Sequence, residues 1–157
     1  METSVPGIYA AGDCTEGEDI SCGCKRVLAL LPNAYMQGRC AGVNMAGGKE
    51  GFNKAIPMNS IGFFGLHAMT AGSYYGEAEG GKCYDEKTEG GLKRFFTRSG
   101  YLTGFILLGE TERAGIYTSL IRDRIPLSTI DFEMLKRVAT SAAFSSETRR
   151  KKFGGVV

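Results

Sequence analysis

The sequence predicts an α+β fold in which the end of an α/β domain (strand, loop, helix) precedes a small mixed α+β domain. A short apolar run, Ile8 to Ala11, ends at the turn pair Gly12-Asp13 and indicates a buried strand. A helical pattern begins near Pro32, and residues 92–108 show the alternation and central turn of a β-hairpin.

The chain has 157 residues, which is enough for one domain or one and a half. We expect residues 1–48 to be the C-terminal remnant of the first domain and residues 55–140 to be the second. Residues 141–157 form a basic tail that includes Arg149 to Lys152, which we interpret as solvated.

Within the first domain, residues 14–26 are rich in glycine, cysteine and acids and are expected to form a loop. Pro32 suits the first turn of a helix, where its missing N–H does no harm. Small residues then recur at helical spacing and predict a face packed closely on a sheet; they are Ala34, Gly38, Ala41 and Met45. Gly47-Gly48 is expected to end this helix.

In the second domain, the aromatic and glycine-spotted segment 58–71 is typical of strands. A helix is expected around Tyr117 and must end before Pro126. Ser128 resembles the start of a capping box for a last helix that reaches Val138.

Composition excludes several classes of function. A net charge of +2 gives no broad basic field for nucleic acid, and no apolar run approaches the roughly 20 residues of a membrane helix. The start of the chain lacks the pattern of a secretory signal, so a cytoplasmic location is expected. Cys22-Gly23-Cys24 lacks the spacing and the second pair of a zinc site, so no metal is expected.

Residues Thr3 to Asp13 resemble the second flavin-binding motif of the pyridine nucleotide-disulfide oxidoreductase superfamily. By that resemblance Gly12 lets the backbone approach FAD, and the Asp13 carboxylate accepts a hydrogen bond from a ribityl hydroxyl. The helix that starts at Pro32, Asn33 and Ala34 points its positive end at the flavin and suits the charge of the reduced ring.

The segments Arg26 to Gly47 and Gly104 to Arg122 are similar to the rubredoxin reductase and nitrite reductase branch of this superfamily. The resemblance implies an FAD-dependent oxidoreductase that takes electrons from NAD(P)H and passes them to a partner such as rubredoxin. It also implies an interface domain, a homo-oligomer and one wall of a flavin site. The alternative is a non-catalytic dimerisation or redox-partner-binding module.

The chain contains no Gly-x-Gly-x-x-Gly pattern after a strand, so the loops that would hold the pyrophosphates of FAD and NAD(P)H are absent from it. We therefore expect an N-terminal remainder of the same protein upstream of Met1, and no hydride transfer by this chain alone. The catalytic residues are not identified by the sequence.

Three sets of side chains have competing interpretations. His67 lacks a neighbouring proline or glutamate, so we expect a strand residue rather than an acid-base catalyst.

Cys14, Cys22 and Cys24 are expected to be reduced spectator thiols, and the alternative is a redox-sensitive patch near the flavin. Aromatic side chains are expected to pack in a hairpin core, although Phe63-Phe64-Gly65 is also a candidate to approach the isoalloxazine; the set is Phe63, Phe64, Tyr74, Tyr75, Phe95, Phe96 and Phe105.

Overall fold

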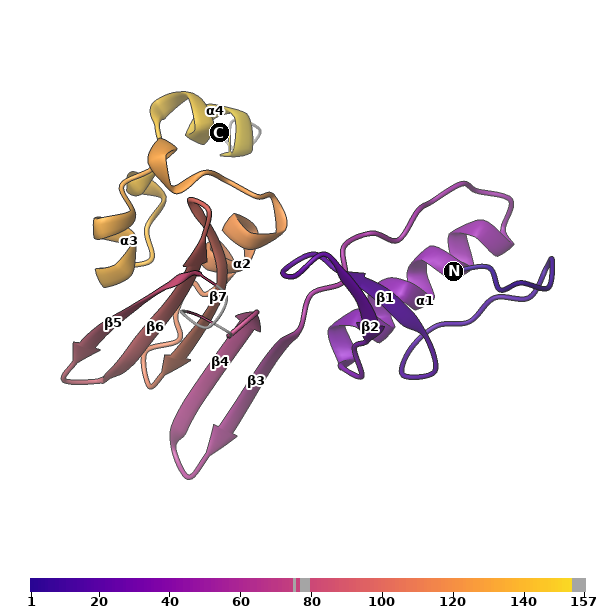
Figure 1. Cartoon of the computed structure of the whole chain (residues 1–157), viewed down its shortest axis with the longest axis horizontal. Helices are drawn as coiled ribbons and strands as arrows, with labels where there is room; N and C mark the ends of the chain where they lie inside the picture. The colour runs from indigo at the N-terminus through magenta and orange to yellow at the C-terminus, as the bar shows by residue number, and fades with distance from the viewer. Residues whose placement is uncertain (75, 77–79, 154–157) are drawn as a thin grey trace. The chain divides into compact units, whose positions relative to one another are not determined.

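The computed structural model describes residues 1–74, 76 and 80–153. The chain divides into two compact units, Met1–Asn59 and Ser60–Val157 (Figure 1). Two sheets are present in the described part, a two-stranded one with the order β1-β2 and a five-stranded one with the order β3-β4-β7-β6-β5. The mixed α+β class expected from the sequence is confirmed.

The first unit contains β1 (Glu16–Asp19), β2 (Cys24–Val27) and α1 (Leu31–Met45). The helix expected from Pro32 is confirmed, and Gly47 follows it with a φ of 88°. The expectation of a plain loop over residues 14–26 was wrong, because β1 and β2 pair antiparallel with Asp19 opposite Cys24. Gly23, with a φ of 71°, lets the chain reverse between them.

The expected strand at Ile8 to Ala11 is not formed. Pro6-Gly7 turns the chain back on its own beginning, so that the Thr3 N–H donates to Ile8 O at 2.8 Å and the Ala10 N–H donates to Met1 O at 3.1 Å. This segment forms one isolated bridge, from Glu2 to Tyr9, and no described strand of a larger sheet extends that pairing. Ile8 is 55% exposed as a result.

The buried face of α1 differs from the one expected. The spacing of small residues pointed to Ala34, Gly38, Ala41 and Met45, but Gly38 and Met45 are exposed. The residues that α1 buries are Asn33, Gln37, Cys40 and Ala41. The buried face therefore combines amide side chains with small ones, and Gly38 has open space where a Cβ would stand.

The second unit is built on five antiparallel strands: β3 (Met58–Phe63), β4 (Leu66–Gly72), β5 (Lys82–Thr88), β6 (Gly91–Arg98) and β7 (Tyr101–Leu108). The expected hairpin is β6–β7, and its turn residues Ser99 and Gly100 both have positive φ. Gly72 is required where β4 meets β7, because a Cβ there would lie 2.0 Å from Thr103 O.

Helices α2 (Gly115–Arg122), α3 (Phe132–Arg137) and α4 (Ser146–Phe153) follow the strands, with short 3-10 turns at Leu127–Thr129 and Ser141–Ala143. The cap of α3 is Asp131, whose carboxylate accepts from the Met134 N–H, and not Ser128 as expected. None of the helices in the described residues is long and apolar enough to cross a membrane.

The core of the second unit is centred on Tyr117 of α2. Its ring lies 5.0 Å from the ring of Phe95 and 5.5 Å from that of Phe105, centroid to centroid. All three side chains are at most 1% exposed. The expected core role of the hairpin aromatics is confirmed for Phe95, Phe96 and Phe105, whereas Phe63, Phe64 and Tyr74 are exposed, and Tyr75 lies outside the described residues.

Tyr117 also ties α2 to α3, because its hydroxyl donates to Leu135 O at 2.6 Å. Burial raises the pKa of Tyr117 to about 12. The folded chain thus favours the un-ionised phenol, and this stabilisation is complete below the ordinary tyrosine pKa of about 10. It is lost as the pH rises towards the folded-state value.

We predict that Tyr117→Phe lowers the free energy of unfolding by about 1 kcal/mol at pH 8, because the Leu135 carbonyl loses its donor. At pH 11 the difference should shrink, since only the wild-type chain loses stability through this phenol. Urea unfolding followed by circular dichroism measures both values. Tyr35→Phe, at an exposed position, is the control, and an equal difference at both pH values would contradict the prediction.

Candidate functional site

Gly12 lies in the turn that follows the extended segment, with a φ of 89° that favours glycine. Its N–H donates to Oε1 of Gln37 at 2.6 Å. Its carbonyl accepts from the Thr15 N–H at 3.0 Å and from the Thr15 hydroxyl at 2.8 Å. Asp13, the next residue in this turn, is exposed to solvent.

The start of α1 carries neither an acidic residue nor a side-chain cap. Its cap, Leu30, provides no side-chain hydrogen bond, and the first turn contains no acidic residue. Pro32 is exposed in that turn, and the N–H groups of Asn33 and Ala34 both donate to Leu30 O. The positive end of the helix dipole is therefore not neutralised by an acid of its own first turn.

The Gly12 turn and the first turn of α1 pack directly on each other. A Cβ placed on Gly12 would lie 3.8 Å from Cβ of Ala34. This spacing is an ordinary van der Waals distance, and the hydrogen bond from the Gly12 N–H to Gln37 is the direct link between the turn and α1. The position of Asp13 relative to a flavin is not tested by it and stays a prediction.

Asn33 serves the fold with its side chain. It is fully buried, its amide N–H donates to Ile56 O at 2.9 Å, and its Oδ1 accepts from the Ile56 N–H at 3.2 Å. Both ends of the amide are thus used within the first unit. The Asn33 backbone N–H is also engaged, with Leu30 O, and the predicted contact of Asn33 with a cofactor stays a prediction.

Gln37 is the residue that the sequence analysis missed. It is 1% exposed, and its Oε1 accepts from both the Gly12 N–H and the Thr15 hydroxyl. Gln37 is four residues after Asn33, so both amides lie on the same face of α1. That spacing of amides among small residues was the signal available in the sequence.

A hollow of about 500 Å³ lies on the same unit, at the surface formed by Thr3, Ala10, Thr15, Gly17 and Phe52. Its walls also include the charged side chains of Glu16, Glu18 and Lys25. None of the predicted cofactor residues lines it. We therefore keep the Gly12 turn and the start of α1 as the candidate site. There, Gly12 has a positive φ and the first turn of α1 contains no acidic residue.

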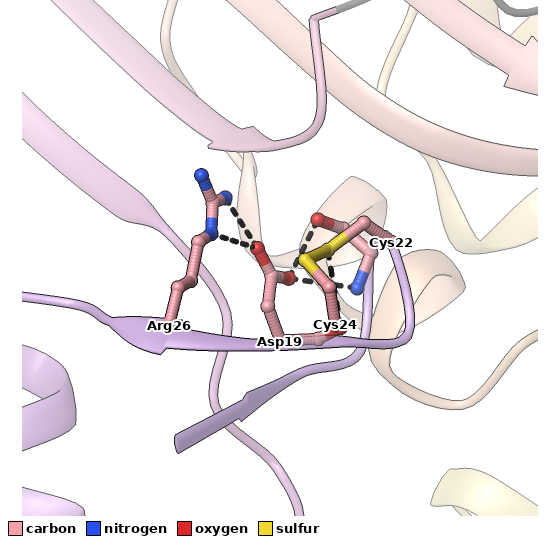
Figure 2. The surroundings of a disulfide bond; sticks show 5 residues. Asp19, Cys22, Cys24 and Arg26 are labelled. Atoms are coloured by element: carbon pink, nitrogen blue, oxygen red, sulfur yellow. Dashed lines mark hydrogen bonds and ion pairs between the residues drawn. A yellow bond between two sulfur atoms is a disulfide. The ribbon is translucent and has the colours of Figure 1, made fainter. Parts of the chain in front are cut away.

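The tip of the β1–β2 hairpin contains a disulfide between Cys22 and Cys24 (Figure 2). The expectation of reduced spectator thiols was wrong for this pair, because the turn at Gly23 brings the two cysteine side chains close enough to form a bond. Cys14 is a free, exposed thiol. In the part of the chain that the structure describes, no group of three or more His, Cys, Asp or Glu residues is arranged to hold a metal.

Asp19 anchors this hairpin tip. Its carboxylate is fully buried and accepts from the Ser21 N–H at 2.8 Å, from the Ser21 hydroxyl at 2.6 Å and from Nε of Arg26 at 2.8 Å. Nη2 of Arg26 contacts the same carboxylate oxygen, as Figure 2 shows. A buried carboxylate is stabilised only by such complete pairing.

His67 lies in β4, and its side chain is exposed. Its backbone carbonyl accepts from the Gly109 N–H at 2.8 Å, and its ring lies near the position of a Cβ on Gly62. The expectation of a strand residue is confirmed. Nothing in this arrangement adds an acid-base partner to the imidazole.

No protein-family model matches the chain. The NADH-dependent phenylglyoxylate dehydrogenase subunit epsilon of Aromatoleum evansii is 36% identical over 135 residues, which cover 83% of this chain and 32% of that protein. The nitrite reductase [NAD(P)H] of Bacillus subtilis strain 168 is 24% identical over 149 residues, which cover 92% of this chain and 18% of that protein. The chain thus spans a third or less of these relatives.

Solved structures share the fold. An FAD-dependent pyridine nucleotide-disulphide oxidoreductase from Desulfovibrio vulgaris matches 83% of this chain and 35% of its own with a TM-score of 0.71 and 24% identity. The putidaredoxin reductase in a covalent complex with putidaredoxin matches 100% of this chain and 35% of its own, with a TM-score of 0.69 and 16% identity. NADH:rubredoxin oxidoreductase from Clostridium acetobutylicum matches 88% of this chain and 35% of its own, with a TM-score of 0.60 and 21% identity.

The two-unit α+β fold is that of the C-terminal portion of FAD- and NAD(P)-binding oxidoreductases. The chain is thus similar, over a partial region, to an NADH-dependent dehydrogenase subunit and a nitrite reductase, and it shares its fold with a solved FAD-dependent pyridine nucleotide-disulphide oxidoreductase.

We predict that Gln37→Leu, which keeps the approximate volume, lowers the free energy of unfolding of the first unit by about 1–3 kcal/mol. The Gly12 N–H loses its acceptor, while the Thr15 hydroxyl keeps the Gly12 carbonyl. Hydrogen exchange at the Gly12 amide should become about tenfold faster or more. Tyr35→Leu, on the exposed side of the same helix, is the matched control, and unchanged exchange at Gly12 would contradict the pinning role of Gln37.

Proposed function

We propose that this chain is the C-terminal part of an FAD-dependent NAD(P)H oxidoreductase that passes electrons to a redox partner, and that it supplies one wall of the flavin site. The observation that carries the proposal is the attachment of the Gly12 turn to α1, where the Gly12 N–H donates to Oε1 of Gln37 at 2.6 Å and a Cβ built on Gly12 would lie 3.8 Å from Cβ of Ala34. The similarity to an NADH-dependent dehydrogenase subunit over most of the chain supports the same class of function.

The residues present fit the cofactor. Gly12 has the positive φ that the turn requires, and the exposed Asp13 carboxylate is able to accept from a hydroxyl. The α1 start, free of acids, suits a ring that gains negative charge. FAD would supply the conversion of two-electron to one-electron transfer, and this chain would bind and orient it.

The remainder of the catalytic machinery is proposed to lie in an N-terminal part of the same protein. The NAD(P)H and the FAD pyrophosphates require glycine-rich loops at strand ends, a pattern that this sequence does not contain. We propose that this chain alone does not transfer hydride.

We further propose a small redox protein as the electron acceptor. Two structural neighbours bear names of this kind, a putidaredoxin reductase solved with putidaredoxin and an NADH:rubredoxin oxidoreductase. The likeness to both is a likeness of fold, so the acceptor is a proposal for the whole protein.

Flavin content tests the proposal directly. In the natural full-length protein, Asp13→Ala should lower the FAD retained after purification and dialysis by about tenfold, the effect expected for one lost charge-assisted hydrogen bond. The absorbance of bound flavin measures it. Glu89→Ala, at another exposed carboxylate, is the control and should leave flavin content unchanged. Equal flavin in the Asp13 variant and in the wild type would contradict the assignment.

A second candidate function is a dimerisation or partner-binding module, and one feature of the second unit favours it. The β3–β4 hairpin carries a run of exposed apolar side chains at the edge of the five-stranded sheet: Ile61 (57% exposed), Phe63 (65%), Phe64 (96%) and Leu66 (49%). Apolar side chains gathered in this way mark contact surfaces. In Figure 1 this hairpin forms one side of the sheet.

We predict that the chain self-associates through this hairpin and that Phe64→Asn weakens the association. Phe64 has a φ of 46°, a conformation that asparagine tolerates better than phenylalanine, so the thermal stability of the chain should be equal or higher. Sedimentation velocity over a concentration series measures the association. Ser99→Asn, at the positive φ of the β6–β7 turn, is the matched control. A wild-type chain that is monomeric at all concentrations would refute the prediction.

A further inference from the structure

The Cys22–Cys24 disulfide closes a very short loop, with a sequence separation of 2. A disulfide stabilises a fold mainly by restricting the unfolded chain, and the effect is smallest for the shortest loops. This bond therefore contributes little to holding the hairpin. Structural support is therefore not the main effect of this bond.

The hairpin tip is held without it. The carbonyl of Asp19 accepts from the Gly23 N–H at 2.7 Å and from the Cys22 N–H at 3.3 Å, while the Asp19 carboxylate binds Ser21 and Arg26. The Ile20 N–H donates to Ala55 O at 3.0 Å and attaches the turn to the body of the unit. These bonds fix the backbone on both sides of the cysteines, whichever oxidation state the sulfurs have.

The two sulfurs differ in their surroundings. Cys24 is exposed, whereas Cys22 is half-buried and its Sγ lies 3.8 Å from Asp19 O. In the disulfide this sulfur carries no proton. After the released thiolate has taken up a proton, the Cys22 thiol has the Asp19 carbonyl as an acceptor at this distance. Exposed disulfides are also the ones that exchange most readily.

We propose that Cys22–Cys24 is a reversible redox site that exchanges with small-molecule thiols, with Cys24 as the sulfur attacked and Cys22 as the sulfur released. The exposed Lys25 ammonium beside Cys24 favours the approach of an anionic thiolate, although Glu18 lies opposite it in the hairpin. This proposal is independent of the flavin role of the Gly12 turn.

The exchange takes two steps. In the first, the sulfur of a thiolate bonds to Cys24 Sγ while the Sγ–Sγ bond breaks, and its electron pair goes to Cys22 Sγ, which takes up the proton that the attacking thiol lost. In the second, another thiolate attacks the small-molecule sulfur of the mixed disulfide and leaves Cys24 as a thiol. Two small thiols are oxidised to one disulfide, and the protein disulfide gains two electrons and two protons.

The test uses the whole chain without flavin or denaturant. It is equilibrated with glutathione at several ratios of reduced to oxidised form, quenched with acid, alkylated and mapped by mass spectrometry. The expected result is that Cys22 and Cys24 convert reversibly between disulfide and dithiol as the ratio changes, and that circular dichroism does not change. A pair that stays oxidised in excess thiol until urea is added would overturn the proposal, as would unfolding upon reduction.

Single variants test which sulfur is attacked. With oxidised glutathione, Cys24 in Cys22→Ser should form the mixed disulfide about tenfold faster than Cys22 in Cys24→Ser, because its sulfur is the accessible one. Equal or reversed rates would overturn the assignment. Cys14→Ser, which removes the other exposed thiol, should leave the exchange unchanged, and loss of exchange in that variant would show that Cys14 is the attacking group.

Discussion

The first unit depends on the amide side chains that α1 turns inward. Asn33, Gln37 and Asn44 each hold the backbone of a different loop: Asn33 binds Ile56, Gln37 binds Gly12, and Asn44 binds both the N–H and the carbonyl of Glu50. Buried amides are stable only when their hydrogen bonds are satisfied, so each of these contacts demands one geometry. The helix therefore positions the loops by directed bonds, where an apolar face would allow them to slide.

The second unit is organised by a different constraint. Aromatic rings from β6, β7 and α2 fill its centre. The Tyr117 hydroxyl links α2 to α3 through its hydrogen bond to Leu135 O. Lys93 adds a polar link from the sheet, because its ammonium donates to Arg137 O at 2.8 Å and pairs with Glu110 at 2.9 Å. The Lys93 ammonium and the Thr88 hydroxyl hold the pKa of the Glu110 carboxyl below its usual range. This unit therefore has an aromatic core, whereas the buried apolar side chains of the first unit are not aromatic: Leu28, Cys40, Ala41, Ala55 and Ile56.

The sequence predicted the elements whose signals are local. The β6–β7 hairpin follows from alternation and the Ser99-Gly100 turn, and α1 follows from Pro32 and the closing glycines. Prediction failed where a distant partner decides. Residues 14–26 were predicted to be a loop because they are rich in acids, and the sequence does not show that Arg26 pairs with Asp19 and allows it to be buried in a strand. The buried face of α1 was misplaced because a prediction from the spacing of small and apolar residues does not include a buried polar residue such as Gln37. The Gly12 turn was located by its resemblance to a flavin motif, but its acceptor was not.

The two chemical features of the first unit share a scaffold but are separately anchored. Gln37 holds the Gly12 turn and Thr15, immediately before β1, whereas Asp19 and Arg26 hold the far end of the same hairpin. A change in bonding at Cys22 and Cys24 is therefore confined to the tip, because the Asp19 network does not include the sulfur–sulfur bond. Sites without shared partners are expected to act additively. A flavin wall and a thiol-exchange site are compatible on one small unit for this reason.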